Sequence, residues 1–116
     1  MKQKFRLRSS IDFKRVRRSG KSYAHPLIVL IKQANEIETS RFGISAGRSM
    51  GNAVQRNRAK RRIREVIRPR ISEIQSGWDL IFLARTPLKN ASYSELQTAI
   101  DQLIKRAGIS KEQNVN

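Results

Sequence analysis

The chain has 116 residues, the length of one ordinary domain, and it contains no cysteine, which excludes disulfides, thiolate metal sites and thiol nucleophiles. It carries 25 Lys and Arg residues against 9 Asp and Glu residues, a formal net charge of +16. The longest apolar runs, residues 27–31 and 80–84, are far too short to span a membrane, and the basic N-terminus lacks the apolar segment of a signal peptide. We therefore expect a soluble, cytoplasmic protein with no membrane partner.

The positive charge is distributed unevenly along the chain. Residues 1–70 contain 20 basic and 4 acidic side chains, whereas residues 71–116 contain 5 of each. Crowding like charges on a small fold costs stability, and a polyanion is the usual partner that offsets this cost. A solvated basic face without a partner is the alternative, which a charge of this size disfavours. The first seventy residues are thus expected to bind nucleic acid.

Capping residues and chain breakers predict the element order α-β-β-α-β-α. Ser9 or Ser10 can cap the first helix, and Ser92 with Glu95 forms a capping box for the last one. Pro69 removes a backbone donor, so it should kink or end the middle helix near Arg68. The predicted elements are a helix over residues 11–18, strands over 27–33 and 41–46, a helix from 52 to about 74, a strand over 78–84 and a helix ending at Gly108, with a further short strand near Ser22.

The apolar pattern indicates how these elements pack. Residues 78–84 are almost continuously apolar, as expected of a strand that is covered on both faces. The strand over residues 41–46 should return antiparallel after a polar turn. The last helix carries one apolar stripe that should face a sheet, formed by Leu96, Ile100, Leu103, Ile104 and Ala107. The expected fold is an α+β two-layer sandwich, with a single domain over residues 1–108 and a flexible C-terminal tail over residues 109–116.

The middle helix carries the strongest functional signal. At 100° per residue, its apolar positions share one arc, and an amide and four cations share the opposite one. Like charges at this spacing destabilise an isolated helix, and only Glu65 is present to relieve them. Guanidinium groups match phosphates with a bidentate fork, and the amide can hydrogen-bond a base edge, a 2′-hydroxyl or a metal-bound water. We call this set the basic stripe, and its members are Asn57, Lys60, Arg61, Arg64 and Arg68.

The residues that a protein active site would need are missing from the chain. A metal-dependent nuclease requires convergent carboxylates, but the nine acidic residues are scattered. His25 is the only histidine and lies beside a proline, so it is interpreted as a turn residue. The loop over residues 47–51 lacks the ending of a phosphate-binding P-loop, although a glycine-bearing loop that opens a basic helix can hold one phosphate. We therefore expect no catalytic residue and no metal ligand in this chain.

The sequence resembles a known family. The run Gly51-Asn52-Ala53-Val54-x-Arg56-Asn57-Arg58-x-Lys60-Arg61-x-Ile63-Arg64 is similar to the signature of the bacterial ribonuclease P protein subunit. The similarity extends from about residue 4 to residue 107 and includes Arg6-Leu7, Asp12-Phe13, Gly20, Arg41-Phe42-Gly43-Ile44-Ser45, Asp79-Leu80-Ile81 and Ala84-Arg85.

The resemblance implies a function that spacing alone does not show. In that family a large RNA is the catalyst, and the protein helps it to bind precursor transfer RNA and the magnesium ions used for cleavage of the 5′ leader. The magnesium would be held mainly by the RNA partner, with none bound by the protein alone. The partners would be the catalytic RNA and the precursor leader, with no small-molecule substrate, and the protein itself is expected to be monomeric. The residues expected to face the catalytic RNA are Arg48, Arg56, Asn57, Arg58, Lys60, Arg61, Arg64 and Arg68.

The resemblance also implies a leader cleft and an unusual topology. A cleft between the first helix and the sheet would hold the single-stranded leader, with Phe13, Arg17 and Ile31 on its walls. Because Arg17 and Ile31 replace aromatic residues of some relatives, phosphate and apolar contacts should partly substitute for base stacking. Phe13 is equally compatible with a core position on an amphipathic helix. The strands over residues 41–46 and 78–84 should be parallel neighbours in a mixed four-stranded sheet, joined by a left-handed crossover.

Two other function classes remain open from the residues. A structural RNA-binding protein of ribosomal type would show the same charge pattern without any catalytic role. A DNA-coating architectural protein is a third class, but the minor-groove arms or wedge residues that it needs are not evident. Stimulation of a catalytic RNA at low magnesium would separate these classes.

Overall fold

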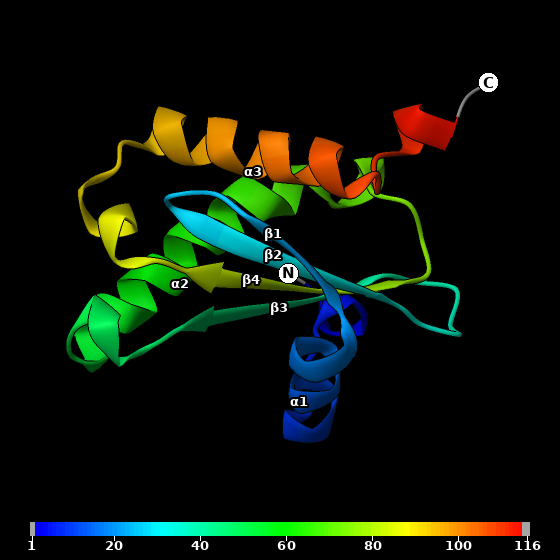
Figure 1. The fold of residues 1–116 in the computed structure, drawn as a ribbon, viewed down its shortest axis with the longest axis horizontal. Helices are drawn as coiled ribbons and strands as arrows, with labels where there is room; N and C mark the ends of the chain where they lie inside the picture. The colour runs from blue at the N-terminus through cyan, green and yellow to red at the C-terminus, as the bar shows by residue number, and fades with distance from the viewer. Residues whose placement is uncertain (1, 115–116) are drawn as a thin grey trace.

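Four strands form one mixed sheet in the computed structural model of the protein, which describes residues 2–114 (Figure 1). The strand order is β1-β2-β4-β3. β2 pairs antiparallel with both β1 and β4, whereas β3 pairs parallel with β4. The strands are β1 (Lys21–Ala24), β2 (Ile28–Ala34), β3 (Arg41–Ala46) and β4 (Trp78–Ala84). The short strand expected near Ser22 is β1.

Three α-helices and several 3-10 turns complete the fold, and the predicted caps are present. Ser9 caps the first helix, and the Ser92–Glu95 capping box opens the last, which ends at Gly108 in the left-handed conformation with φ 70°. The middle helix gives way at Arg68 to a 3-10 segment containing Pro69, as predicted. The helices are α1 (Ser10–Ser19), α2 (Ala53–Ile67) and α3 (Tyr93–Ala107), and the 3-10 turns are η1 (Gln3–Phe5), η2 (Arg48–Met50), η3 (Arg68–Glu73), η4 (Thr86–Asn90) and η5 (Lys111–Asn114).

The two faces of the sheet have separate apolar cores, because successive strand residues point to opposite sides. α2 and α3 cover one face, where Leu30, Leu80 and Phe82 are buried. α1 lies on the opposite face over a smaller cluster that contains Val16, Ile31, Ile81 and Leu7. β4 is therefore covered on both faces, as its sequence predicts. The predicted α+β architecture is confirmed, and α1 adds a partial third layer to the sheet and the α2–α3 layer.

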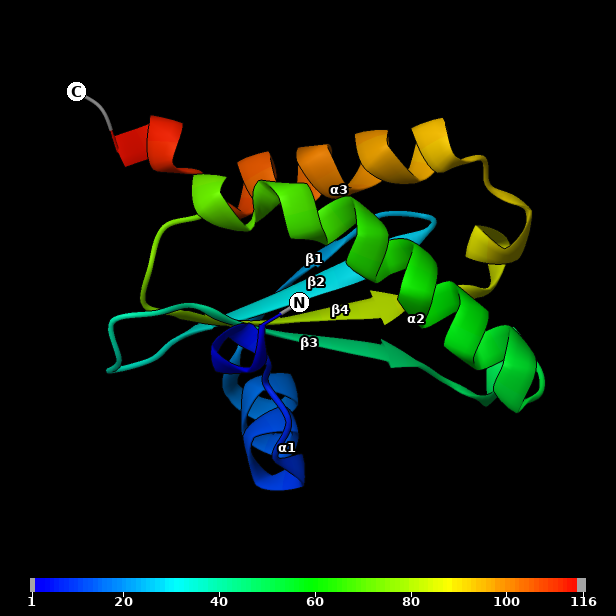
Figure 2. The same ribbon diagram turned by 180° about the vertical axis from the view of Figure 1, so that it is seen from behind.

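The connection from β3 through α2 to β4 is left-handed. In Figure 2, α2 lies in front of the sheet, both strands point to the right, and β4 lies above β3. About 98% of parallel crossovers have the opposite hand. The hand implied by the family resemblance is therefore confirmed against the general rule.

The expected antiparallel direction of β3 relative to β2 is confirmed, although β4 lies between the two strands. β4 is the most apolar strand. It therefore gains most from an interior position in the sheet, where both of its faces are covered and its apolar side chains are removed from water. Ile109, the first residue of the predicted flexible tail, is buried, and its carbonyl accepts a hydrogen bond from the backbone of Gln75 at 2.8 Å. The packed domain thus continues past Gly108, while residues 115–116 of the predicted tail lie outside the described residues.

Candidate nucleic-acid interface

The basic stripe lies on the side of α2 that faces away from the core. Ala59, Ile63, Val66 and Ile67 are the buried residues of this helix, as its periodicity predicts. The Asn52–Gln55 capping box fixes the start of the helix. Four members of the stripe line a shallow hollow of about 400 Å³ together with an apolar residue, and the lining residues are Val54, Asn57, Lys60, Arg61 and Arg64. The side chain of Val54 is 75% exposed, which makes it an apolar contact surface within a cationic stripe.

The other residues expected to contact RNA flank this hollow. Arg68 is exposed at the end of α2 and forms an ion pair with Glu65, with 3.1 Å between Nη2 and Oε1. Arg48 is exposed in η2, just before α2. Arg58 is exposed on one side of the stripe, and Arg56 is half-buried on the other side. The stripe therefore gathers the cations into one surface, with Arg48 and Arg68 near its two ends.

Arg62 belongs to the same helix but has a structural role. Its guanidinium donates hydrogen bonds to the backbone carbonyls of Leu88 at 2.9 Å and Ala91 at 2.5 Å. These bonds tie α2 to the segment before α3. Arg62 is thereby held apart from the basic stripe, which fits its absence from the predicted set.

A second hollow connects the first helix with the basic stripe. It has a volume of about 240 Å³ and lies at the β3 edge of the sheet, where the N-terminal segment pairs with β3 through an Arg6–Phe42 bridge. We call it the edge hollow, and it is lined by Arg6, Leu7, Arg8, Phe13, Phe42, Gly43, Ile44 and Arg64. Arg64 also lines the hollow of the stripe, so the two surfaces are continuous.

Of the three residues predicted to line a leader cleft, only Phe13 borders the edge hollow. Its half-buried ring lies against Gly43, where a Cβ atom would be only 2.5 Å from the ring tip. Arg17 is exposed on α1 but does not line this hollow. Ile31 is only 5% exposed and packs with Val16 under α1, so it does not line this hollow either. The reason is that β2 lies in the interior of the sheet and α1 covers this part of it.

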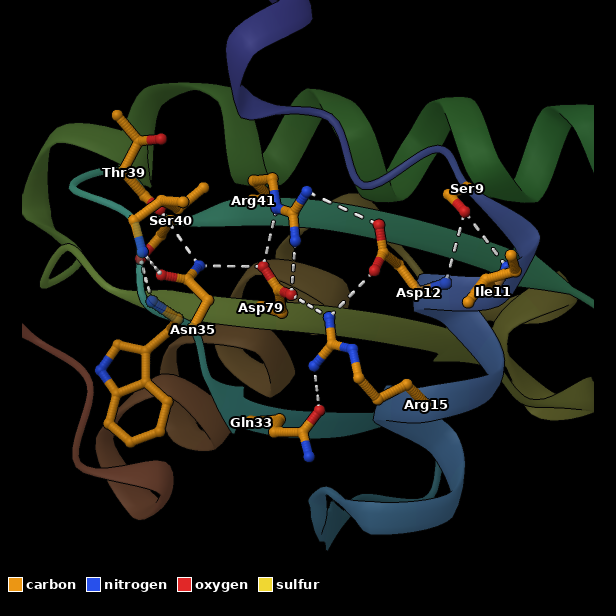
Figure 3. Close-up of polar contacts among 12 residues, drawn as sticks. Ser9, Ile11, Asp12, Arg15, Gln33, Asn35, Thr39, Ser40, Arg41 and Asp79 are labelled. Carbon is orange, nitrogen blue, oxygen red and sulfur yellow. Dashed lines mark hydrogen bonds and ion pairs between the residues drawn. The ribbon is translucent and has the colours of Figure 1, made fainter.

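A network of charged groups that was not predicted from the sequence attaches α1 to the sheet (Figure 3). Asp79 in β4 is fully buried. Arg41 donates to both of its carboxylate oxygens, at 2.9 and 2.8 Å, and Arg15 of α1 donates to Oδ2 at 2.5 Å. Asn35 donates to Oδ1 at 2.9 Å, and Asp12 pairs with both arginines. The one sequence feature that points to this network is Asp79, the single acidic residue in the apolar run 78–84.

The same contacts keep Asp79 charged. Burial alone would raise the pKa of this carboxyl, but hydrogen bonds from Arg41, Asn35 and Arg15 hold the pKa below its ordinary value. A buried carboxylate with four donors is stable only while its partners stay in place. The network therefore fixes the position of α1, and with it the position of Phe13 at the edge hollow.

Neither a metal-binding cluster nor a membrane-spanning helix is found among the described residues. Residues 2–114 contain no group of three or more His, Cys, Asp and Glu side chains that could hold a metal ion. The ring of His25 accepts a hydrogen bond from the backbone of Leu27 at 3.1 Å, as a turn residue does. Within the same range, none of the helices has the length and apolar content needed to cross a bilayer.

Comparisons with known proteins agree with this geometry. A model of the Ribonuclease P family matches residues 1–108. The ribonuclease P protein component of Clostridium novyi is 44% identical over 111 residues, covering 94% of this chain and 98% of that protein. The structure of the Staphylococcus aureus RNase P protein has a TM-score of 0.83 at 34% identity and covers 92% of this chain and 98% of that one. The Thermotoga maritima RNase P protein has a TM-score of 0.78 at 30% identity, covering 87% of this chain and 96% of that one. The chain thus belongs to the ribonuclease P protein family.

Proposed function

We propose that this protein is the RNA-binding subunit of a ribonuclease P holoenzyme that removes the 5′ leader from precursor transfer RNA. The RNA partner is the catalyst, and the protein binds both this RNA and the leader. The enzyme is an endonuclease only as a ribonucleoprotein. The protein acts as a monomer in the cytoplasm and takes no small-molecule substrate.

The continuous surface from the basic stripe to the edge hollow is the observation that carries this proposal. The stripe places cations and one amide on a helix that is fixed by its buried face, so they are held ready to bind without refolding. Folded RNA presents a dense array of phosphates, and arginine forks suit them. The binding surface for the catalytic RNA comprises Arg48, Arg56, Asn57, Arg58, Lys60, Arg61, Arg64 and Arg68.

The edge hollow supplies the leader site of the proposal. It joins an aromatic ring, that of Phe13, to the cations Arg6, Arg8 and Arg64. Single-stranded nucleic acid is bound in this manner, with bases on aromatic rings and phosphates along a cationic groove. Arg17, exposed on α1, extends the cationic side of this path.

Magnesium belongs to the RNA partner in this proposal. Cleavage of a phosphodiester by metal ions requires ligands that hold those ions beside the scissile bond. The scattered carboxylates of residues 2–114 do not fit such a site. Asn57, which lies in the stripe, can hydrogen-bond a metal-bound water but is not proposed as a ligand.

Reconstitution tests the proposal. Purified protein is mixed with the ribonuclease P RNA of the same organism and a precursor transfer RNA at low magnesium. We expect the protein to raise the cleavage rate. The double variant Lys60→Ala/Arg64→Ala should lose most of this gain. The control double variant Lys105→Ala/Arg106→Ala should keep it. A protein that binds RNA but gives no stimulation would instead support the structural, ribosomal type.

The absence of catalysis by the protein is tested in the same preparation. Protein without RNA should leave the precursor intact at any magnesium concentration. Metal-dependent cleavage that disappears in a variant of one of its own carboxylates, such as Glu65→Gln, would contradict the assignment of catalysis to the RNA.

A further inference from the structure

A third hollow lies beyond the C-terminal end of α2 and shares only Arg68 with the basic stripe and Phe42 with the edge hollow. It occupies about 670 Å³ and is lined by residues of η1, the start of β3 and η3. Figure 2 shows the end of the sheet where β3 and β4 begin, and the first residues of β3 lie there. Its apolar walls come from Phe5, Phe42, Pro69, Ile71 and Ile74. We call it the terminal pocket. Neither the basic stripe nor the edge hollow accounts for it.

The size and lining of the terminal pocket are those of a binding site. Ligand pockets usually measure about 300–1,000 Å³ and have apolar walls with a few polar groups. Phe42 is almost fully buried at 3% exposure, whereas Phe5 is half-buried, so one aromatic ring lies deep and the other near the opening. An apolar hollow that stays open to water is unfavourable, and a planar apolar occupant would remove that cost.

The rim of the pocket is cationic. Lys2, Arg68 and Lys111 lie around it, with Glu38 as the only acidic residue among its lining residues. A further cation lies close by, since Lys4 Nζ is 5.0 Å from the centroid of the Phe5 ring. An occupant should therefore combine a flat apolar part with negative charge. A nucleotide has this combination, because its base is planar and its phosphate is anionic.

We propose that the terminal pocket binds one unpaired nucleotide of the partner RNA, with the base against the phenylalanine rings and the phosphate at the cationic rim. This inference rests on the proposed function. Arg68 links the two surfaces, because it is both the last member of the basic stripe and part of the pocket rim. An RNA that follows α2 to its end therefore reaches the pocket directly.

The polar groups in the pocket indicate little preference for one base. The exposed hydroxyls of Ser72 and Ser76 line it and make no hydrogen bond within the described part of the chain. A hydroxyl both donates and accepts, so it can satisfy the edge of any base. Stacking rather than base reading should then supply the affinity.

Filling the pocket is the first test. Ser72→Trp and Ser76→Trp each place an indole at the opening without removing a buried contact or a charge, and Ser94→Trp on α3 is the matched control. Affinity for the cognate ribonuclease P RNA should fall about fivefold or more in the two pocket variants, with the melting temperature unchanged. Unchanged or raised affinity in both folded pocket variants overturns the inference.

Crosslinking is the second test and separates this inference from the proposed function. The chain has no cysteine, so Ser72→Cys, Val54→Cys and Ser94→Cys each give a unique attachment point for a benzophenone probe. We expect crosslinks to an unpaired nucleotide from position 72, crosslinks from position 54 in the stripe, and none from position 94. Crosslinking from position 54 but not 72 overturns only the pocket assignment, whereas failure at both positions overturns the proposed RNA interface as well.

Discussion

Asp79 shows how one buried charge can decide the position of a whole helix. It lies in the most apolar strand, where a neutral residue would be expected, and three different segments of the chain send donors to it. Its pKa lies below the ordinary carboxyl value of about 3.9, so the ionised form is favoured in the folded protein. The stability that this carboxylate contributes is present above about pH 4 and is lost as the pH falls through the folded-state pKa.

Replacing this carboxylate tests the network. Asp79→Asn leaves Arg15 and Arg41 without their buried partner and should lower the free energy of unfolding by about 3 kcal/mol, as measured by urea denaturation at pH 7. The difference between wild type and variant should be constant above about pH 4 and should shrink as the pH falls below that value. Glu95→Gln is the matched control, since glutamine also serves a capping box, and should be nearly neutral. Equal stability of Asp79→Asn and wild type would show that the network does not hold α1.

Phe13 is the residue at which a core role and a binding role can be separated. Its ring is half-buried against Gly43 and also borders the edge hollow. Phe13→Leu keeps most of the apolar volume but removes the flat ring, so the melting temperature should change little. Affinity for a precursor with a leader should fall about fivefold or more relative to mature transfer RNA, because a stacked base contributes about 1–3 kcal/mol. Equal losses for both RNAs together with a lower melting temperature would assign Phe13 to the core alone.

The basic stripe acts at the scale of an element, because α2 holds its cations in register. If six to eight phosphates are neutralised, the log–log dependence of binding on salt should have a slope of roughly −4 to −7. Lys60→Ala with Arg64→Ala should flatten this slope by about one to two units. Lys105→Ala with Arg106→Ala removes the same charge from α3 and should leave the slope unchanged. An unchanged slope in the stripe variant would remove these residues from the interface.

The close approach of α1 to β3 is a second property of elements. The position of Gly43 leaves room for the Phe13 ring, so Gly43→Ala should force the ring to shift and destabilise the protein by about 1–3 kcal/mol. Gly47→Ala is the control, since nothing lies within 4 Å of the added Cβ atom. The cost of Gly43→Ala should be smaller in a Phe13→Leu background, as double-mutant analysis of thermal unfolding would show. Additive effects would mean that the two residues do not compete for the same space.

At the scale of the whole molecule, folding and RNA binding should respond to salt in opposite directions. The net charge of +16 makes the folded protein repel itself. Raising NaCl from about 10 to about 150 mM shortens the Debye length from about 30 to about 8 Å, so the melting temperature of the free protein should rise. The rise should be smaller in the Lys60→Ala/Arg64→Ala variant, while RNA affinity falls over the same range. A melting temperature that is flat or falls with salt would contradict this account.

The amino-acid sequence by itself determined the elements and the face that α2 presents. The Ser92–Glu95 box, the break at Pro69 and the alternation of Ile63 with the cations of the stripe act within a few residues, so they can be recognised without a fold. The family signature added the parallel pairing of β3 with β4 and the left-handed connection. Periodicity alone favours the opposite hand.

Only the tertiary structure decided which distant residues meet. Asp79 receives donors from positions 15, 35 and 41, Ile31 is covered by α1, and Phe5 forms the terminal pocket with η3. The residues that form these contacts lie tens of positions apart in the sequence, so no local pattern of spacing or charge predicts them. The order of the strands in the sheet is likewise not encoded locally. The burial of β4 at the centre of the sheet sets this order, and that burial exists only once all the layers have packed.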